Sequence, residues 1–572
     1  MRDFAALYTP EGEAVSGEVW NVYPRPQMRR DSFYSLNGEW DFGCGTEKAY
    51  PEKIRVPFAP ESLLSGIGRG HRKGEKLFYR KAFSLPDGFI KGRVLLNIGA
   101  CDQVCVVSLN GKEIGRHEGG YHPFAFDITD ALEEENLLEI IVTDELNGNE
   151  FPYGKQTMKR GGMWYTPVSG IWQTVWLESV PSKYIRKVSI ETGADYAYVS
   201  VDGDIGEGEV ILHSKGGTRF PLQKGKACIK IAEPVLWSPE NPHLYDFTVR
   251  AGEDEIQSYF ALRTLEIREI GGIRRMCLNG QPYFFHGVLD QGYYPDGLFT
   301  PAKPENYEND ILFLKSLGFN TLRKHIKAEP EWFYYLCDKM GMCVFQDMIN
   351  NGNYSFLRDT ALPTIGFKKK NDKRAHRNEI TRKRFIECME ETIERLKNHP
   401  SIVYWTIFNE GWGQFDSQKM YERLKKLDPS RFVATVSGWF KGADTDIAAE
   451  HVYFKPVKIK AGNKPVVVSE FGGYTYREKG HVFNPDNEYG YRKFKTRKEF
   501  VRGIIALYEN EIVPAVSKGL CGTIYTQLSD VEDEINGLIT YDRRVMKVLP
   551  EEFRPVSEAI LNEMEKIRRG QS

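Results

Sequence analysis

The stretch Ile402-Val-Tyr-Trp-Thr-Ile-Phe-Asn409-Glu410 decides the fold of this chain. A continuous apolar run, rich in β-branched and aromatic residues, ends abruptly in an amide and an acid. This is the pattern of a strand that is buried on both faces and carries a carboxylate at its C-terminal end. The pattern recurs in Pro465-Val-Val-Val-Ser-Glu470-Phe-Gly-Gly. In a barrel, two such parallel strands direct both carboxylates to the end where active sites lie. Paired carboxylates that face one bond are typical of enzymes that cleave glycosidic linkages.

Strand-like runs alternate with amphipathic helices after about residue 270, which indicates parallel βα units. Eight strands in about 300 residues match the size of a (β/α)8 barrel, also called a TIM barrel. The predicted strands span 283–288, 319–323, 343–346, 402–408, 432–436, 447–453, 466–469 and 522–526. The predicted helices span 305–317, 330–340, 376–397, 416–427, 494–511 and 552–567. No helix is visible after the fifth and sixth strands.

The first part of the chain is rich in short strand patterns and has no segment of helical periodicity. Asn110-Gly111, between two strand patterns, is a strong signal for a two-residue hairpin. We therefore predict a jelly-roll β-sandwich for residues 1–182, of the kind that binds sugars in other proteins. Residues 183–268 continue with short strands and turns rich in Gly, Asp and Pro, and their length fits one immunoglobulin-like sandwich. Residues 269–572 form the predicted barrel.

Length, charge and cysteine pattern limit the class of protein. At 572 residues the chain is too long for one core. The formal net charge of −2 gives no support for binding nucleic acid or an anionic membrane, and no apolar run is long enough to span a bilayer. The N-terminus lacks the apolar segment of a secretory signal, although a signal removed earlier stays an alternative. The nine scattered cysteines have no metal-ligand spacing and suit a reducing compartment. We expect a cytoplasmic protein, with a homo-oligomer left open.

Further motifs give the chain a resemblance to glycoside hydrolase family 2, the family of β-galactosidases, β-glucuronidases and β-mannosidases. The motifs follow the family's order over nearly the whole chain, with Asn-Glu at a strand end and Ser-Glu-Phe-Gly-Gly after it. They are Pro24-Arg-Pro, Leu36-Asn-Gly-Glu-Trp-Asp-Phe, Gly170-Ile-Trp-Gln-Thr-Val-Trp-Leu, Leu236-Trp-Ser-Pro-Glu-Asn-Pro-His-Leu-Tyr, Phe260-Ala-Leu-Arg-Thr, Leu278-Asn-Gly-Gln-Pro and His286-Gly-Val.

The resemblance implies a retaining mechanism with Glu410 as general acid/base and Glu470 as nucleophile. A retaining site holds its two carboxyl groups about 5 to 5.5 Å apart, so the two are not expected to ionise together. One carboxyl must stay protonated to donate to the leaving oxygen, and the other must be anionic to attack the anomeric carbon. The alternative for each glutamate is an ion pair at the barrel rim.

Other residues acquire expected roles from the same resemblance. Asn409 is expected to bind the sugar 2-hydroxyl, and Arg323 is expected to hold the nucleophile ionised. Tyr453 matches a family tyrosine near the nucleophile. Trp439 and Tyr525 are candidate stacking platforms for an apolar sugar face. The alternatives are a turn cap for Asn409 and plain barrel packing for the two aromatic residues.

Departures from the family pattern also carry predictions. The first strand is followed by Asp290 instead of a histidine-glutamate pair, and His325 lies one position out of register. Because the family's magnesium-binding segment is not recognisable, the sequence predicts no required metal and no cofactor. Asp290, Gln346 and Asp347 are interpreted as acceptors for sugar hydroxyls. The N-terminal sandwich could add residues to the pocket, and the candidates are Trp164 and Tyr165.

The segment after the last strand predicts the charge of the sugar. β-Glucuronidases of this family carry an Asn-x-Lys motif there, and its lysine pairs with the sugar carboxylate. This chain has Glu534-Ile-Asn536 instead. An acid in this position would repel a uronate and accept from a hydroxyl, so a neutral sugar is expected. Arg543 or Lys324 could supply a cation from another direction.

The leading hypothesis is therefore an exo-acting retaining β-glycosidase that acts on a carbohydrate, with a terminal β-galactoside as the first substrate to consider. A β-glucuronidase, or a β-glycosidase specific for mannosides or arabinosides, is the alternative within the family. A non-catalytic carbohydrate-binding protein on the same fold is the alternative from another class. A metal-dependent amidohydrolase would need clustered His and Asp at strand ends, and none of the 11 histidines forms an H-x-H pair.

Overall fold

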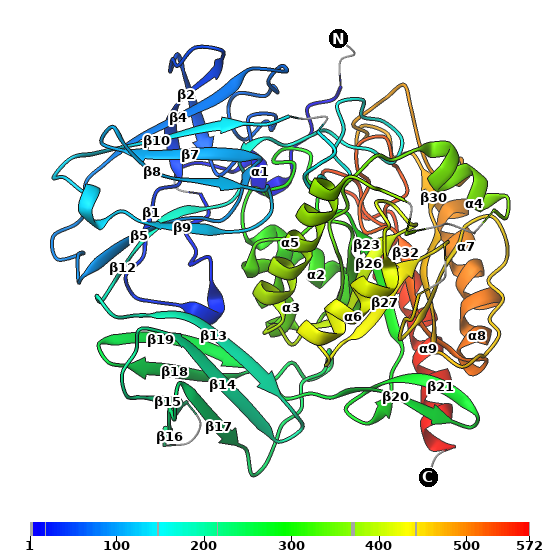
Figure 1. Ribbon diagram of the computed structural model, residues 1–572. Helices are drawn as coiled ribbons and strands as arrows, with labels where there is room; N and C mark the ends of the chain where they lie inside the picture. The colour runs from blue at the N-terminus through cyan, green and yellow to red at the C-terminus, as the bar shows by residue number, and fades with distance from the viewer. Residues whose placement is uncertain are drawn as a thin grey trace.

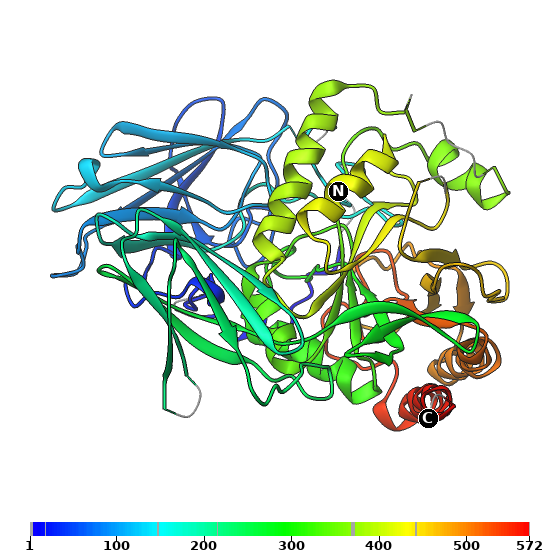
Figure 2. The same ribbon diagram turned by 60° about the horizontal axis from the view of Figure 1, so that its bottom comes forward.

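Two β-sandwiches lie against one side of a barrel that is surrounded by helices (Figure 1). The computed structural model describes residues 4–17, 19–145, 148–213, 216–367, 372–373, 375–440 and 443–570. Figure 2, turned about the horizontal axis, shows the two sandwiches stacked beside each other with the barrel to their right. The predicted fold class, a jelly roll and an immunoglobulin-like sandwich followed by a TIM barrel, is confirmed.

The N-terminal sandwich packs two antiparallel sheets face to face. Its core is apolar because alternate residues of the strands point inward, as the buried Trp40, Tyr79 and Leu177 do. Asn110 and Gly111 both have positive φ (51° and 79°) and form the predicted tight hairpin. One sheet has the order β3 (Glu52–Val56), β2 (Gly38–Gly45), β4 (Lys76–Phe83), β10 (Asn136–Thr143), β7 (Val104–Leu109), β8 (Lys112–Glu118). The other has the order β1 (Tyr34–Ser35), β12 (Val175–Val180), β5 (Arg93–Ile98), β9 (Phe124–Asp127), and β11 (Gly170–Ile171) pairs with β6 (Cys101–Asp102).

The immunoglobulin-like sandwich consists of a three-stranded and a four-stranded antiparallel sheet. A hairpin then leads from it to the base of the barrel, at the lower right of Figure 1. The sheets have the orders β13 (Ile185–Thr192), β14 (Tyr196–Gly203), β17 (Lys226–Lys230) and β16 (Thr218–Pro221), β15 (Gly208–Leu212), β18 (Tyr245–Ala251), β19 (Asp254–Phe260). The hairpin sheet has the order β20 (Leu265–Ile270), β21 (Ile273–Leu278), β22 (Gln281–Pro282).

Eight parallel strands form the barrel, and each corresponds to a predicted strand. Six of them are buried along their whole length, β26 among them, as the uninterrupted apolar runs predict. Between the first and last strands of the sheet, the Gly438 amide donates to the carbonyl of Ala449 (3.3 Å) and brings the barrel near to closure. The order is β27 (Phe432–Ser437), β26 (Ile402–Asn409), β25 (Cys343–Asp347), β24 (Thr321–Lys324), β23 (Phe285–Asp290), β32 (Leu520–Thr526), β29 (Val466–Gly472), β28 (Ala448–Val452).

The six predicted barrel helices are all present. In the part of the chain that the structure describes, no helix follows β27 or β28, which agrees with the sequence pattern. None of the described helices is long and apolar enough to cross a membrane. The barrel helices are α2 (Glu305–Leu317), α3 (Glu331–Met340), α5 (Glu379–Leu396), α6 (Ser417–Leu427), α7 (Arg497–Leu507) and α9 (Pro550–Arg569). Smaller elements are α1 (Pro10–Glu13), η1 (Pro26–Met28), η2 (Thr129–Ala131), η3 (Leu357–Ala361), α4 (Leu362–Thr364), η4 (Tyr508–Ile512), α8 (Val513–Ser517), β30 (Tyr474–Tyr476) and β31 (Arg492–Phe494).

A buried charge network joins the N-terminal segment to both sandwiches. Glu178, fully buried in the jelly roll, accepts hydrogen bonds from Arg25 (2.6 Å) and Arg30 (3.2 Å). Arg30 also binds Asp254 of the immunoglobulin-like sandwich (2.8 Å). Burial alone would raise the pKa of Glu178, but the charges of Arg25 and Arg30 lower it below its ordinary value. Three parts of the chain are thereby fixed relative to one another.

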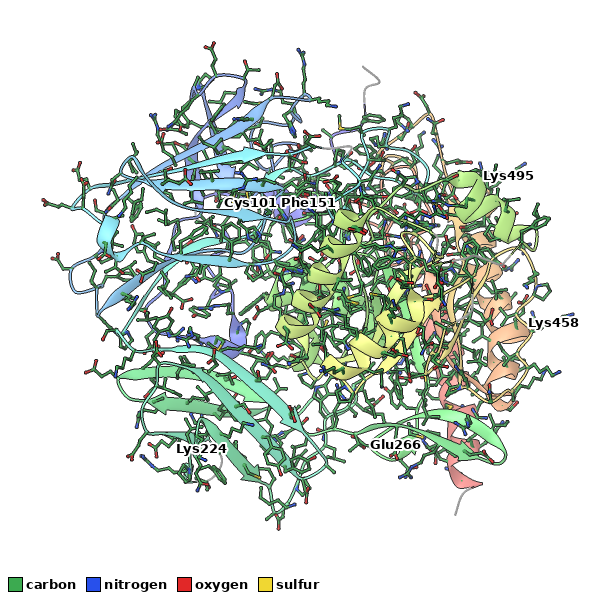
Figure 3. All side chains as sticks on the ribbon, in the orientation of Figure 1. Cys101, Phe151, Lys224, Glu266, Lys458 and Lys495 are labelled. Atoms are coloured by element: carbon green, nitrogen blue, oxygen red, sulfur yellow. The ribbon has the colours of Figure 1, made fainter. Side chains whose placement is uncertain are left out.

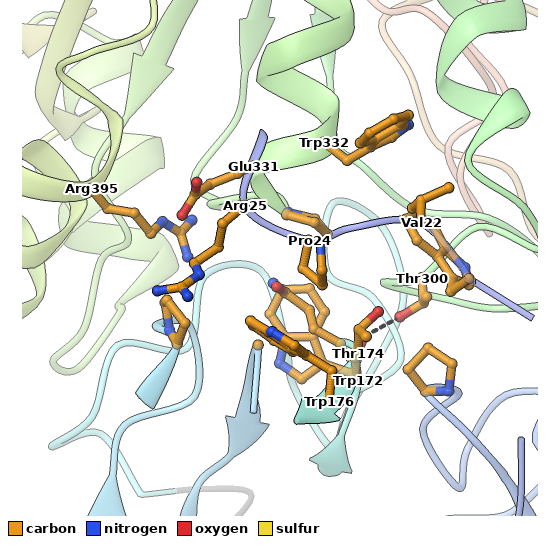
Figure 4. Close-up of a pocket in the computed structure, with 16 residues that line it drawn as sticks. Val22, Pro24, Arg25, Trp172, Thr174, Trp176, Thr300, Glu331, Trp332 and Arg395 are labelled. Carbon is orange, nitrogen blue, oxygen red and sulfur yellow. Dashed lines mark hydrogen bonds between the residues drawn. The ribbon is translucent and has the colours of Figure 1, made fainter. Parts of the chain in front are cut away.

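The sandwich also contacts the barrel through aromatic and cationic side chains. Phe151, labelled in Figure 3, lies where the sandwich meets α5, with the Arg384 guanidinium 3.3 Å from its ring centroid. At another part of this junction, Trp172 and Trp176 of the sandwich face Trp332 of the barrel across a cavity of about 30 Å³ (Figure 4). A cavity this small has room for a water molecule or two and is part of the packed junction.

Removal of the central charge of the network should destabilise the junction. Glu178→Gln leaves Arg25 and Arg30 short of a counter-charge in a buried site, which typically costs about 3 kcal/mol. Thermal and denaturant unfolding should show an earlier transition than for the wild type, whereas Glu39→Gln, at an exposed ion pair with Lys53, should not.

The difference in stability between the wild type and Glu178→Gln should become smaller at acidic pH. Because the folded pKa of Glu178 is lowered, its stabilising contribution is present above the unfolded pKa and is lost as the pH falls through the folded pKa. Equal unfolding transitions for the wild type and Glu178→Gln at neutral pH would show that this network does not hold the junction together.

Candidate active site

Glu410 and Glu470 lie side by side at the C-terminal end of the barrel. Glu410 directly follows β26, and Glu470 belongs to β29, so both carboxylates come from strand ends as predicted. One ligand atom from each of the two glutamates and one from His451 all lie within 4.8 Å of one another. Both glutamates are at least nine-tenths buried. Glu410 has a positive φ of 50°, an uncommon conformation for a side chain with a Cβ, and its amide is held by Ser437 O (2.9 Å).

Arg323 holds the Glu470 side of this pair in place. Its guanidinium, which has no exposed surface, donates to Glu470 Oε1 (2.9 Å), to Asn409 Oδ1 (2.9 Å) and to Asp347 Oδ1 (3.0 Å). These three acceptors come from three different strands, β29, β26 and β25. The planar fork of arginine therefore orients three side chains at once.

Glu470 is held in its ionised form. The Tyr453 hydroxyl donates to Glu470 Oε2 (2.6 Å), while Arg323 occupies the other oxygen. Burial alone would raise the pKa of Glu470, but the positive charges of His451 and Arg323 and the hydrogen bond from Tyr453 hold it at about 2. These partners therefore favour the ionised form of the Glu470 carboxylate.

The pKa of Glu410 is shifted in the opposite direction to that of Glu470. Burial raises its pKa above the ordinary value, and the negative charge of Glu470 raises it further. A hydrogen bond with His451 and the charge of Lys155 act in the other direction. The two glutamates are therefore distinguished by their surroundings, with one favoured as the acid and the other as the anion.

His451 bridges the two glutamates, and the sequence analysis did not identify it. Its Nδ1 lies 2.9 Å from Glu410 Oε1 and 3.5 Å from Glu470 Oε2. The imidazole approaches Gly438 so closely that a Cβ at that glycine would lie 2.9 Å from Nδ1. The available signal was spacing, because His451 and Tyr453 are two residues apart at the end of β28 and so face the same side.

Asn409 and Asp347, both predicted to bind the sugar, are joined to Glu470 through Arg323. The side-chain oxygen of Asn409 accepts from Arg323 and from Ser437 Oγ (2.9 Å), so its NH2 group remains for a ligand. Asp347 accepts from Arg323 and faces His325 Nδ1 (2.8 Å), and burial lowers the pKa of His325 to about 4. Asp347 therefore supports Arg323 through contacts within the protein.

Several other residues predicted to bind the sugar make their contacts with protein groups other than the two glutamates. Asp290 accepts from Lys324 Nζ (2.5 Å), and Arg543 pairs with Asp310 (3.4 Å), so neither cation faces the pair unpartnered. Gln346 is fully buried and bonded to Tyr334 and to backbone carbonyls. The aromatic candidates differ from each other: Trp439 packs against His451 (5.6 Å between centroids), whereas Tyr525 is fully buried against Phe471 and Tyr508.

A loop of the jelly roll between β10 and β11 reaches the barrel mouth. The Tyr165 hydroxyl donates to Glu534 Oε2, and Gln527 Nε2 lies 3.4 Å from the same oxygen. Trp164 stacks on Trp412, two residues after Glu410, with the ring centroids 5.3 Å apart. The sandwich residues that were candidates from the sequence are therefore both at this mouth, as is Glu534.

Comparison with family models covers most of the chain. The model "Glycosyl hydrolases family 2, TIM barrel domain" matches residues 269–552. "Glycosyl hydrolase 2 galactose-binding domain-like" matches residues 71–202, and "Glycosyl hydrolases family 2" matches residues 183–263. The chain belongs to glycoside hydrolase family 2.

The curated relatives in family 2 are named as enzymes that act on different sugars. A β-galactosidase of Thermoanaerobacter pseudethanolicus is 26% identical over 439 residues, covering 71% of this chain and 55% of that protein. A β-glucuronidase of Felis catus is 24% identical over 514 residues, covering 77% of this chain and 73% of that protein. This chain thus spans about half to three quarters of the length of these relatives.

Solved structures share the complete family 2 fold. A β-D-glucuronidase from Dictyoglomus thermophilum superposes with a TM-score of 0.71 and 20% identity, covering 94% of this chain and 98% of that one. A family 2 β-galacturonidase from Eisenbergiella tayi, bound to galacturonate, gives a TM-score of 0.68 at 19% identity, covering 93% and 99%. At this identity the likeness establishes the fold and leaves the sugar open.

One group of side chains among the described residues could share a cation, and it consists of Glu410, His451 and Glu470. Two carboxylate oxygens and an imidazole nitrogen are a ligand set that zinc accepts. The same atoms are joined to one another and to Arg323 by the hydrogen bonds described above. The expectation that no metal is required stays a prediction.

His451 should set the pH range of this family 2 site. In His451→Asn the positive charge that lowers the pKa of both glutamates is removed, so both pKa values should rise. Activity that requires protonated Glu410 should then persist to higher pH, and activity that requires ionised Glu470 should begin at higher pH. The pH profile of kcat/KM, on whichever nitrophenyl β-glycoside the wild type cleaves, should shift upward at both limbs. His213→Asn, in the immunoglobulin-like sandwich, should leave the profile in place, and an unshifted profile in His451→Asn would refute this role.

Proposed function

We propose that this protein is an exo-acting retaining β-glycosidase that releases one neutral sugar from the end of its substrate, with β-galactosides as the first substrates to test. One observation carries the proposal. Two buried glutamates at the C-terminal ends of β26 and β29 have carboxylate oxygens within 4.8 Å, and their pKa values are shifted in opposite directions. This separation suits a direct attack by one carboxylate and leaves no room for the water that an inverting enzyme places between them.

In the first step, the Glu470 carboxylate attacks the anomeric carbon. The bond from that carbon to the leaving oxygen breaks, and the leaving oxygen takes the proton of Glu410. The products are a glycosyl ester of Glu470 and the free alcohol of the leaving group. The raised pKa of Glu410 supports its role as the acid, and the ion pair of Glu470 with Arg323 supports its role as the nucleophile.

In the second step, Glu410 acts as a base. Once Glu470 is esterified its negative charge is gone, so the electrostatic influence that raised the pKa of Glu410 is removed. Glu410 then takes a proton from water, the water oxygen attacks the anomeric carbon, and the ester bond breaks to restore the Glu470 carboxylate. Two inversions at one carbon retain the β configuration of the released sugar.

The polar residues near the pair support recognition of the sugar. The Asn409 NH2 group is placed to donate to the 2-hydroxyl, a contact that strengthens in the transition state. Trp439, beside His451, remains a candidate for stacking on an apolar sugar face.

A neutral sugar is supported by the charges near Glu534. Asn536 is fully buried and its side chain bonds to Gln527, so no lysine occupies the position that binds a uronate in the family's glucuronidases. Lys324 and Arg543, the two cations that could have replaced it, are paired with Asp290 and Asp310.

Replacement of the nucleophile tests the mechanism. Glu470→Ala should remove nearly all turnover of a nitrophenyl β-galactoside while the protein stays folded, because no glycosyl ester can form. Azide should restore part of the rate and give the glycosyl azide of inverted configuration. Near-normal turnover by Glu470→Ala without azide would disprove the assignment.

Side-by-side kinetics test the sugar charge. On nitrophenyl β-glycosides of galactose, glucose, mannose, arabinose and glucuronic acid, kcat/KM for the glucuronide should be at least about a hundredfold below that for the preferred neutral sugar, equivalent to roughly 2.7 kcal/mol. A glucuronide that is cleaved with a higher kcat/KM than every neutral glycoside would show that the site binds uronates.

A further inference from the structure

Lys155 lies in the sandwich loop that reaches the barrel mouth, and this loop is anchored to the barrel on both sides of it. On one side, the Tyr153 amide donates to Asn350 O (3.0 Å) in the loop after β25. On the other side, the Thr166 amide donates to Glu532 Oε1 (2.9 Å) in the loop after β32. The position of Lys155 over the barrel is therefore fixed by backbone contacts.

The Lys155 side chain is buried, and none of the residues that the structure describes serves as its anionic partner. It is 8% exposed, and its ammonium lies 5.5 Å from the Tyr165 ring and 5.9 Å from the Trp412 ring. Within the described ranges of the chain, no hydrogen bond or ion pair is made by this ammonium. Buried lysines are normally paired, because an unpaired charge is costly to remove from water. Arg160, in the same loop, is by contrast paired with Glu532 and Asp533.

The charge of Lys155 acts on residues from three parts of the barrel mouth. Burial is the largest influence on the pKa values of Glu410, Glu534 and His325, and the charge of Lys155 lowers all three. Glu410 follows β26, His325 follows β24, and Glu534 lies in the loop after β32. A cation that acts on all three must lie above the barrel mouth, within electrostatic reach of the catalytic acid.

Glu534 offers the complementary group. The hydrogen bonds from Tyr165 and Gln527 both reach its Oε2. No hydrogen bond from the described residues reaches Oε1, which leaves this oxygen to accept from a ligand. Lys155 can only donate and Glu534, when ionised, can only accept, so together they match hydroxyl groups, which do both. A uronate carboxylate could use Lys155 but would face Glu534 with like charge.

We infer that Lys155 is a sugar-binding residue: its ammonium donates to hydroxyl oxygens of the bound terminal sugar beside the Glu534 carboxylate, so that the sandwich and the barrel select the sugar jointly. This inference rests on the proposed glycosidase function. It gives the N-terminal sandwich a part in substrate choice in addition to packing.

The test replaces the ammonium and leaves the length of the side chain unchanged. For Lys155→Met, kcat/KM on a nitrophenyl β-galactoside should fall by about 10- to 100-fold, the usual effect of losing a hydrogen bond to a charged group. Lys159→Met, an exposed lysine of the same loop, should match the wild type. Thermal unfolding of both variants checks that the loop stays docked. Lys155→Gln is measured in parallel and should be impaired as well, so that a failure of Lys155→Met to fold does not end the test.

Substrates in which one hydroxyl group is missing or inverted distinguish a sugar-binding role of Lys155 from a purely structural role. The same variants are compared on the 6-deoxygalactoside, on the arabinopyranoside without carbon 6, and on the glucoside, the epimer at carbon 4. The loss in Lys155→Met should shrink to less than about threefold on at least one of them, because the hydroxyl that Lys155 binds is then absent or turned away. The alkaline limb of the pH profile should also move upward, because a charge that lowers the pKa of Glu410 is removed.

The outcomes separate the inference from the function on which it rests. If the wild type cleaves no β-glycoside, the proposed function fails. If the wild type is active and Lys155→Met equals Lys159→Met, the inference about Lys155 fails and the function stands. An equal loss on every substrate, with no pH shift, would mean that Lys155 only supports the loop. A loss confined to the glucuronide would mean that Lys155 binds a carboxylate, and would overturn the hydroxyl assignment.

Discussion

The Arg323 guanidinium is the interaction on which the site depends. It carries a permanent charge in a place without solvent, and it binds side chains of β25, β26 and β29 at once. Such a buried cation is stable only with its anionic partners present, so Asp347 and Glu470 are needed for the barrel centre as well as for the proposed chemistry. Asp347 accepts from Arg323 and faces His325, and its expected role as an acceptor for a sugar hydroxyl stays a prediction.

The difference between the two glutamates follows from the charges and hydrogen bonds around them, and Arg323 contributes to it together with His451. Both carboxylates are buried, and burial raises the pKa of each. Only Glu470 contacts Arg323, and its ionised form is therefore favoured, while Glu410, bonded to His451, keeps a raised pKa. Two residues of the same chemical type thus acquire different protonation states because of a few ångströms in position.

The N-terminal sandwich contributes side chains to the mouth of the barrel. Its loop between β10 and β11 places Lys155, Trp164 and Tyr165 at the mouth, and the buried network around Glu178 holds the sandwich in position. A displacement of the sandwich would move the loop away from Glu534. The stability of the domain junction and the proposed substrate selectivity are therefore expected to depend on each other.

The sequence by itself determined the fold class and the two glutamates. Buried strands can be recognised in a sequence as uninterrupted apolar runs. An acid at the end of such a run can be recognised too, because its position depends only on neighbouring residues, as in Phe408-Asn409-Glu410. The resemblance also placed Arg323 and Tyr453 near Glu470, and the tertiary structure decided which further side chains surround the two glutamates. Asp290 and Tyr525 looked available for a sugar, but their partners Lys324 and Phe471 occupy them. For His451 the two-residue spacing from Tyr453 was the only local signal, and nothing in the local sequence marks Lys155. They reach the barrel mouth through barrel closure and domain docking, which join residues far apart in the chain.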